Sequence, residues 1–325
     1  MRRVILLSAL YFFLELAVAN AAGVKNFDIP ADGAGPGIRL LVWTPCAETP
    51  RELDARGAIF LAVPGCAVTG EKLPLIVISH GRRGWFGGHH DTAAALADAG
   101  FVVAALNHPG DTWRDTSRTD SLSVLVERPA DIKRLIDYML DSWPDAARID
   151  ARRIGLYGFS FGGYTGLAVV GGNPDLRKGL PSCATSSLLA CKQLESGEAP
   201  SQPVTSDPRV RAAVIVDPYP AFVFPEKDLK EVAVPVQLWS SDVAQNADGL
   251  SGCCAAAIKQ RLPMLDYHFV TNAKHFSFLA TCSPKEVQGN PTACTDAPGF
   301  NRNDFHQQLH AEMIGFFRKH LGENQ

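Results

Sequence analysis

The chain alternates short apolar runs, many of them β-branched, with longer segments whose apolar residues recur at helical spacing. Short apolar runs between glycine-rich or polar segments are typical of strands, and the longer amphipathic segments are typical of helices. Strands are expected at Ile38–Trp43, Ala58–Val63, Leu75–Ser79, Phe101–Leu106, Arg153–Gly158, Ala212–Val216, Val234–Trp239 and Asp266–Val270. Helices are expected at about 89–99, 122–141, 161–171, 252–261 and 303–320.

This alternation predicts an α/β fold with a mostly parallel central sheet of about eight strands, flanked by helices. Several strands are apolar on both faces, as buried parallel strands are. No repeat or shift in composition marks a linker, so we expect a single domain over residues 22–325. Two stretches rich in Pro, Ser and Gly, 172–210 and 281–303, interrupt the pattern, and we expect them to rim a pocket.

The N-terminus has the pattern of a secretory signal peptide. Two arginines precede an apolar run over Val4–Ala19, and Ala19 and Ala21 supply the small residues that precede a cleavage site. The apolar run is short for a membrane span and contains Glu15. We therefore interpret residues 1–21 as a signal peptide and predict a secreted or periplasmic protein with no stable membrane span after cleavage.

The composition adds an exclusion. The chain is 46% hydrophobic and 20% charged, and its formal net charge is −3. A nucleic-acid-binding protein normally carries a basic surplus, so no nucleic-acid partner is predicted.

An even number of cysteines, eight, fits an oxidising compartment and disulfide bonds. Their spacing suggests the pairs Cys46–Cys66, Cys183–Cys191 and Cys282–Cys294, whereas the adjacent Cys253 and Cys254 either form a vicinal disulfide or stay free. No C-x-x-C pair occurs, so we predict no structural zinc site; no other pattern in the sequence predicts a metal site or a cofactor.

The motif that carries chemistry is Gly158-Phe159-Ser160-Phe161-Gly162, which lies between a predicted strand and a predicted helix. In that context the turn is tight and exposes the serine, and small residues on either side let the backbones pass. The start of a helix also presents N–H groups to a developing anion. We predict that Ser160 is a nucleophile; the alternative is a glycine-rich turn with a capping serine.

A serine nucleophile needs a histidine as its base. Where the nucleophile lies in a G-x-S-x-G turn between a strand and a helix, the acid follows the serine along the chain and the histidine comes last. His275 lies just after the last predicted strand, where the base is needed, and is our candidate. Other histidines beyond Ser160 are expected inside a strand (His268) or on the surface of the last helix (His306, His310 and His320).

Two aspartates are candidates for the acid. Asp217 ends one predicted strand, and Asp242 follows the next. Either carboxylate can hold the outer imidazole nitrogen and fix its tautomer. The residues themselves leave this choice open.

The oxyanion hole requires two backbone N–H donors. One is expected from Phe161, directly after the nucleophile, and the other from Arg82, in the loop after the strand Leu75–Ser79. His80 is expected to order this loop, and residues 107–111 to line the pocket. Aromatic residues near the turn suggest an apolar acyl pocket; they are Trp85, Phe86, Phe159, Phe161 and Phe276.

Four motifs together resemble the platelet-activating-factor acetylhydrolase-like branch of the α/β-hydrolases and bacterial proteins labelled predicted dienelactone hydrolases. They are Ser79-His80-Gly81, Asn107-His108-Pro109-Gly110, the segment Gly158–Gly163, and His275-Phe276-Ser277-Phe278. In that branch the acid maps onto Asp217, although in some bacterial relatives it falls near Asp242, and the oxyanion donors map onto Arg82 and Phe161. The resemblance implies a metal-independent hydrolase of short-acyl esters.

The sequence thus predicts a secreted serine carboxylic-ester hydrolase that works through an acyl-enzyme, on a small-molecule ester that can be lipid-like. Two rivals remain: a secreted serine peptidase of the same fold, and a non-catalytic binding protein on a hydrolase scaffold.

Overall fold

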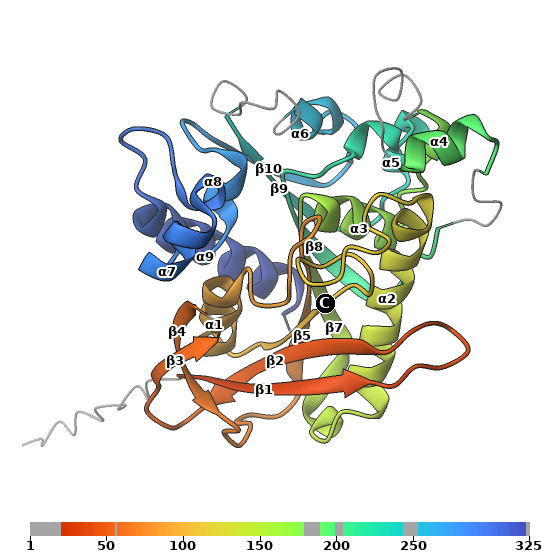
Figure 1. Ribbon diagram of the computed structural model, residues 1–325. Coiled ribbons are helices and arrows are strands. Elements are labelled where there is room, and N and C mark those ends of the chain that lie inside the picture. Colours follow the sequence, from red (N-terminus) through yellow and green to blue (C-terminus); the bar gives the residue numbers. More distant parts are fainter. Residues whose placement is uncertain (1–20, 56, 179–188, 199–203, 243–252, 323–325) are drawn as a thin grey trace, which may run out of the picture.

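A ten-stranded sheet in the order β10-β9-β8-β7-β5-β6-β2-β1-β4-β3 organises the molecule (Figure 1). The computed structural model describes residues 21–55, 57–178, 189–198, 204–242 and 253–322. The strands are β1 Ala21–Ile29, β2 Ile38–Cys46, β3 Arg51–Ala55, β4 Ala58–Pro64, β5 Leu73–Ser79, β6 Val102–Leu106, β7 Ile149–Phe159, β8 Val210–Val216, β9 Val236–Ser241 and β10 Leu265–Val270.

The six neighbouring strands β6, β5, β7, β8, β9 and β10 run parallel to one another. Strand β2 pairs with β6 on one side and with β1 on the other, and both of these pairs are antiparallel. This mostly parallel sheet flanked by helices is an α/β-hydrolase-like fold, as predicted. The strand count is ten, so the prediction of about eight missed β1 and β3. Neither carries a continuous apolar run: β1 exposes Lys25 and Asn26, and β3 is a largely exposed edge strand.

Helices cover both faces of the sheet (Figure 1). Helices α2 (Leu122–Asp141) and α3 (Phe161–Val169) pack in one apolar core, and α1 (His90–Asp98) and α9 (Arg302–His320) pack in the other. The central strands β5 and β6 are buried along their whole length, and each fully buried aliphatic or aromatic side chain contributes about 1.5–3 kcal/mol. The remaining helices are α4 Leu189–Glu195, α5 Glu226–Lys230, α6 Cys253–Ile258, α7 Pro284–Gly289 and α8 Pro291–Cys294.

One expectation about the last helix is wrong. Helix α9 packs against α1, and this packing buries His306, which is only 4% exposed, and half-buries His310. The histidines of this helix were expected on the surface, because the apolar stripe was read from its larger residues alone. His306 therefore belongs to the interior.

Two predicted disulfides are present, Cys46–Cys66 and Cys282–Cys294. Closing loops of this size contributes about 3 kcal/mol each by restricting the unfolded chain. Cys191 is also disulfide-bonded, but its predicted partner Cys183 lies outside the described residues. Cys253 and Cys254 begin α6, and the state of their side chains stays a prediction.

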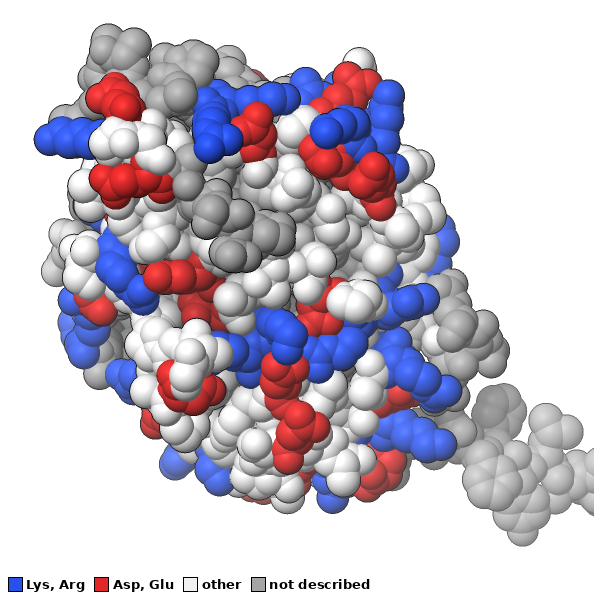
Figure 2. Space-filling view, turned by 90° about the vertical axis from the view of Figure 1, so that its right-hand side faces the viewer, with Lys and Arg blue, Asp and Glu red and all other residues white. Residues whose placement is uncertain are grey.

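The surface carries charges of both signs. On the face shown in Figure 2, Lys and Arg side chains are interspersed with Asp and Glu side chains. Among the described residues, none of the helices is both long and apolar enough to cross a membrane. The predicted signal peptide lies outside the described residues except for Ala21, which is the first residue of β1.

Candidate active site

Ser160 occupies the sharp turn between β7 and α3, with φ 55° and ψ −116°. This backbone conformation is strained for a residue with a side chain and is found where a turn must expose a reactive group. The flanking glycines are required by close approach: a Cβ on Gly158 would lie 2.1 Å from the Gly162 carbonyl oxygen, and one on Gly162 would lie 1.9 Å from the Ser79 carbonyl oxygen. The turn therefore depends on the glycines of the motif.

Asp217 and His275 form a hydrogen-bonded pair. Asp217 directly follows β8, is 2% exposed, and its Oδ2 lies 2.9 Å from Nδ1 of His275. The carboxylate also accepts hydrogen bonds from the backbone N–H of Ser241, at 2.8 Å, and from the Ser241 hydroxyl. Together with the imidazole, these donors satisfy the hydrogen-bonding capacity of a buried carboxylate.

This pairing selects the nitrogen that can act as a base. Because Nδ1 of His275 donates to Asp217, Nε2 is the nitrogen that would accept a proton. The imidazole lies against Phe159, with ring centroids 4.6 Å apart, so it sits beside the residue that precedes Ser160. The fold thus brings Asp217 and His275 together next to the turn, although they are 58 positions apart in the sequence.

Asp242 has a different position. Its carboxylate accepts a hydrogen bond from the backbone N–H of Asn272 at 3.1 Å, and its own N–H donates to the Ala273 carbonyl at 3.0 Å. These bonds support the loop that leads to His275. Of the two candidate acids, the structure pairs Asp217 with the imidazole and places Asp242 on the backbone of the histidine loop.

The loop with the second expected oxyanion donor passes beside the serine. A Cβ on Gly81 would lie 3.3 Å from Cβ of Ser160, and the turn closes through the Gly84 N–H donating to the Gly81 carbonyl at 2.9 Å. Arg82 lies within this turn, and its guanidinium pairs with Asp120. Phe161 is the first residue of α3, so its N–H has no acceptor within the helix.

A buried arginine underlies this loop, and sequence reasoning missed it. The guanidinium of Arg128 donates to the His80 carbonyl, to Asp111 and, at 3.3 Å, to the Thr165 hydroxyl. Asp111 in turn accepts from the Arg83 N–H at 3.1 Å. Burial lowers the pKa of Arg128, although the Asp111 carboxylate opposes that shift. The signal was a charged residue on the apolar face of the predicted helix 122–141.

His80 ties the same loop to the neighbouring strand end. Its Nε2 accepts from the His108 backbone N–H at 3.2 Å, so its Nδ1 carries the proton that is shared with the Gly81 carbonyl at 2.7 Å. Burial, reinforced by the charge of Arg128, lowers the pKa of His80 well below its usual value. His80 is therefore a neutral, fully hydrogen-bonded part of the loop.

A cavity of about 640 Å³ adjoins the turn through Gly81, Arg82 and Phe159, although Ser160 and His275 themselves are not among the residues that line it. Three of the five aromatic residues expected around an acyl pocket line it, namely Trp85, Phe159 and Phe276. Phe161 instead packs against Tyr219, and Phe86 packs in the core. The stretch 281–303 borders this cavity through α7 and α8. Residues 107–111 are not among those that line it; Asn107 and Asp111 instead accept hydrogen bonds from the backbone of residues 83–86, next to Arg82, in the segment that we call the oxyanion loop for its expected role.

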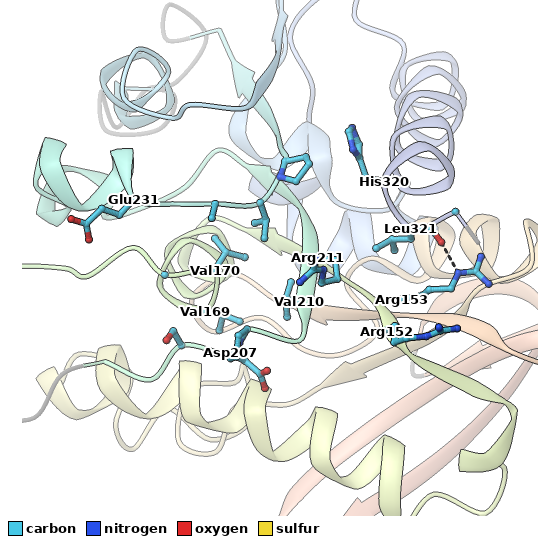
Figure 3. Close-up of a pocket in the computed structure, with 17 residues that line it drawn as sticks. Arg152, Arg153, Val169, Val170, Asp207, Val210, Arg211, Glu231, His320 and Leu321 are labelled. Atoms are coloured by element: carbon cyan, nitrogen blue, oxygen red, sulfur yellow. Dashed lines mark hydrogen bonds between the residues drawn. The ribbon is translucent and has the colours of Figure 1, made fainter. Parts of the chain in front are cut away.

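A second hollow, of about 470 Å³, lies at the opposite, amino-terminal edge of β7 and β8 (Figure 3). Arginine and acidic side chains such as Arg152 and Asp207 border it, and Arg153 Nε donates to the Leu321 carbonyl there at 2.5 Å. None of the candidate catalytic residues lines this hollow. The carboxyl ends of the strands, where open α/β sheets bind ligands, are therefore the edge that carries the candidate chemistry.

Comparisons with known proteins agree with the fold. Residues 89–190, which include Ser160, match the prolyl oligopeptidase family. Among solved structures, the chain is similar to a ferulic acid esterase from Streptomyces cinnamoneus, at 17% sequence identity and a TM-score of 0.60, over 94% of this chain and 91% of that chain. A search of the curated proteins finds no match.

These likenesses place the chain among proteins of the α/β-hydrolase fold and support a hydrolase. The family match spans less than a third of the chain, and the structural likeness at 17% identity shows the fold alone. The roles of individual residues therefore have to be argued from the geometry of this site.

Proposed function

We propose that the protein is a serine carboxylic-ester hydrolase in which Ser160 is the nucleophile, His275 the general base and Asp217 the acid that orients the imidazole. The observation that carries this proposal is the Asp217–His275 hydrogen bond of 2.9 Å, formed beside a serine in a strained turn. That combination is the one that a serine nucleophile needs for activation.

The reaction follows two acyl transfers. His275 removes the proton from the Ser160 hydroxyl as its oxygen attacks the ester carbonyl, and the protonated imidazole then gives that proton to the departing alcohol. Water, deprotonated by the same imidazole, attacks the acyl-enzyme, and the proton returns to Ser160 as the carboxylic acid leaves. The N–H groups of Arg82 and Phe161 are the donors assigned to the oxyanion.

The cavity beside the turn favours a compact acyl or alcohol group. Its walls combine Trp85, Phe159 and Phe276 with the charged Lys285 and Glu286 at the rim. Aromatic walls bind apolar groups, and the rim offers polar contacts to an ester that is apolar only in part. Short-acyl esters, including lipid-like esters of the kind implied by the acetylhydrolase resemblance, are the proposed substrates.

Secretion or a periplasmic location fits the same proposal. The Cys46–Cys66 and Cys282–Cys294 bonds belong to an oxidising compartment, which is where the predicted signal peptide would deliver the chain.

A serine peptidase is the second candidate, because the matched family is the prolyl oligopeptidase family. The same Ser160 and His275 would then act on an amide. A non-catalytic scaffold is the third, and it is disfavoured by the intact Asp217–His275 pair.

Turnover of p-nitrophenyl esters from acetate to long acyl chains tests the proposal, with the mature protein, Ser160→Ala and the control Ser196→Ala. Ser196 is exposed and lies in a segment remote in sequence from the site. Ester turnover that is lost only in Ser160→Ala supports the esterase. Cleavage of peptide amides with no ester turnover supports the peptidase, and failure of a fluorophosphonate to label Ser160 supports the scaffold.

A further inference from the structure

Outside the candidate active site, one carboxylate and two imidazoles converge where α1 meets α9. Asp91 lies in the first turn of α1, and His306 and His310 lie one turn apart on α9. Oδ2 of Asp91 is 2.5 Å from Nδ1 of His306 and 3.8 Å from Nε2 of His310. One ligand atom from each of the three side chains lies within 4.8 Å of the other two.

The imidazole of His306 is oriented as a metal ligand is. Its Nε2 donates to the Ser277 carbonyl at 2.8 Å, which turns Nδ1 toward Asp91. A metal-bound histidine typically donates its other ring N–H to a carbonyl or carboxylate, which fixes the ring and its tautomer. His310 adds a second nitrogen, Nε2, which lies 3.1 Å from the Thr92 hydroxyl and 3.8 Å from Asp91 Oδ2.

The three side chains face a cavity of about 600 Å³, so space for further ligands is present. Asn303, Gln307 and His90 line the same cavity. Nδ1 of His90 is buried and has no hydrogen-bond partner among the residues that the structure describes. A buried nitrogen without a partner is costly, so the packing around this cavity is not fully satisfied in its polar contacts.

We propose that Asp91, His306 and His310 form a binding site for a divalent transition-metal ion of the Zn²⁺ class. Two imidazole nitrogens and one carboxylate oxygen are a ligand set that zinc takes in proteins, with water completing the coordination. Zinc–ligand distances of about 2.0–2.2 Å place ligand atoms about 3–3.5 Å apart. The Asp91–His306 contact would lengthen by about 1 Å or less, and His310 would move inward by a similar amount.

Binding of the ion releases one proton from the site. In the metal-free protein Asp91 and His306 share a proton, and that proton passes to solvent when the ion takes its place. No oxidation or reduction occurs.

The site lies next to the loop of the candidate base. Ser277, whose carbonyl accepts from His306, is two residues beyond His275 in the short 3-10 helix His275–Phe278. A bound ion would join α1, α9 and this loop, so it would stabilise the fold there without touching the ester. The inference stands on this cluster alone and does not depend on the proposed function.

Zinc titration of untagged, EDTA-treated protein by calorimetry tests the site. We expect one Zn²⁺ per chain, a rise in Tm on adding zinc, and a visible Co²⁺ spectrum of low coordination number. His310→Ala and Asp91→Asn should each weaken zinc binding at least about 100-fold. The matched control is His320→Ala, on the same helix but outside the cluster, and it should bind zinc as the parent does.

Zinc binding that is absent in the folded parent, or unchanged in both ligand variants, would overturn the proposal. If a variant does not fold, crystals of the parent soaked in zinc decide the matter. An anomalous peak among Asp91, His306 and His310 supports the site, and a peak only elsewhere contradicts it.

Discussion

The molecule contains two groups of serine, histidine and aspartate in which the histidine–aspartate hydrogen bonds have the same length. One comprises Ser160, His275 and Asp217 in the candidate active site, and the other comprises Ser79, His108 and Asp131 beneath the oxyanion loop. In each group a histidine Nδ1 lies 2.9 Å from an aspartate oxygen, and in the second the Ser79 hydroxyl lies 3.0 Å from Nε2 of His108.

The surroundings of the two groups differ. Ser79 and His108 have no exposed surface, and Ser79 belongs to the regular strand β5. Burial, reinforced by the charge of Arg128, lowers the pKa of His108 well below its usual value, and burial raises the pKa of Asp131 to about 7. Ser160, by contrast, retains 8% exposure and stands on a strained turn at a helix start, and its neighbour Phe159 lines the cavity.

The difference shows that the three residue types do not by themselves make a nucleophile. A serine hydroxyl needs access for the substrate, N–H donors for the oxyanion and a base that can hold a proton. The second group lacks access, and its histidine is held neutral beside a cation. We infer that it supports the loop that carries Arg82.

Replacing Ser160 with Ala should have the largest effect, a loss of ester turnover of at least about 10⁴-fold. Ser79→Ala removes the partner of His108 and should cost about 1–3 kcal/mol of stability, while much of the turnover is kept. Initial rates and urea unfolding of both variants measure the contrast. Equal loss of turnover in two folded variants would remove the distinction between the groups.

Asp217→Asn should have the next largest effect, a fall in kcat of about 10³–10⁴-fold, because the wrong tautomer of His275 is favoured. Asp242→Asn is the matched control and should lower kcat by less than about 10-fold, since its carboxylate supports backbone. Steady-state kinetics of the two variants make the test. The reverse order of effects would assign the acid to Asp242.

Arg128→Met should destabilise the fold by about 3–5 kcal/mol, since it leaves Asp111 buried without its cation. The His80 carbonyl loses a donor at the same time, so the oxyanion loop should loosen and kcat should fall. Urea unfolding and kinetics at low temperature separate the two effects. A folded variant of unchanged stability and kcat would show that the network is dispensable.

Acidification from pH 7 to pH 5 should lower Tm. Histidines whose pKa is depressed in the folded state take up protons first in the unfolded chain, so stability is lost as pH falls below 6.5 toward the folded values. They are His80, His89, His90, His108, His310 and His320. For His89, burial lowers the pKa to about 4, so its contribution disappears between pH 6.5 and about 4.

Groups whose pKa is raised in the folded state have the opposite effect on stability. Burial raises the pKa of Asp131 to about 7 and of Asp98 to about 6, and the pKa of His306 is also raised: burial lowers it, but Asp91 outweighs that effect. These three groups favour the folded state at low pH, but the depressed histidines outnumber them. Calorimetry at pH 7 and 5 should show a smaller fall in Tm for His89→Asn than for the parent. An identical fall would remove His89 as a source of the acid sensitivity.

Much of the fold could be predicted because it depends on local pattern. All eight expected strands and all five expected helices overlap elements of the structure, since buried parallel strands are apolar on both faces. Strands β1 and β3 were not predicted, because partly exposed strands do not have a continuous run of apolar residues. The short helices α4, α5, α7 and α8 lie in segments too short or too polar to show a helical period.

The sequence by itself determined the turn at Ser160, because a G-x-S-x-G motif between a strand and a helix is a local steric requirement. It also indicated His275 by its place after the last strand. Only the tertiary structure shows that Asp217, and not Asp242, contacts Nδ1 of His275, that Arg128 is buried under the loop that carries Arg82, and that Asp91 meets His306. Those are contacts between residues far apart along the chain, and they depend on how strands and helices pack, which no local pattern records.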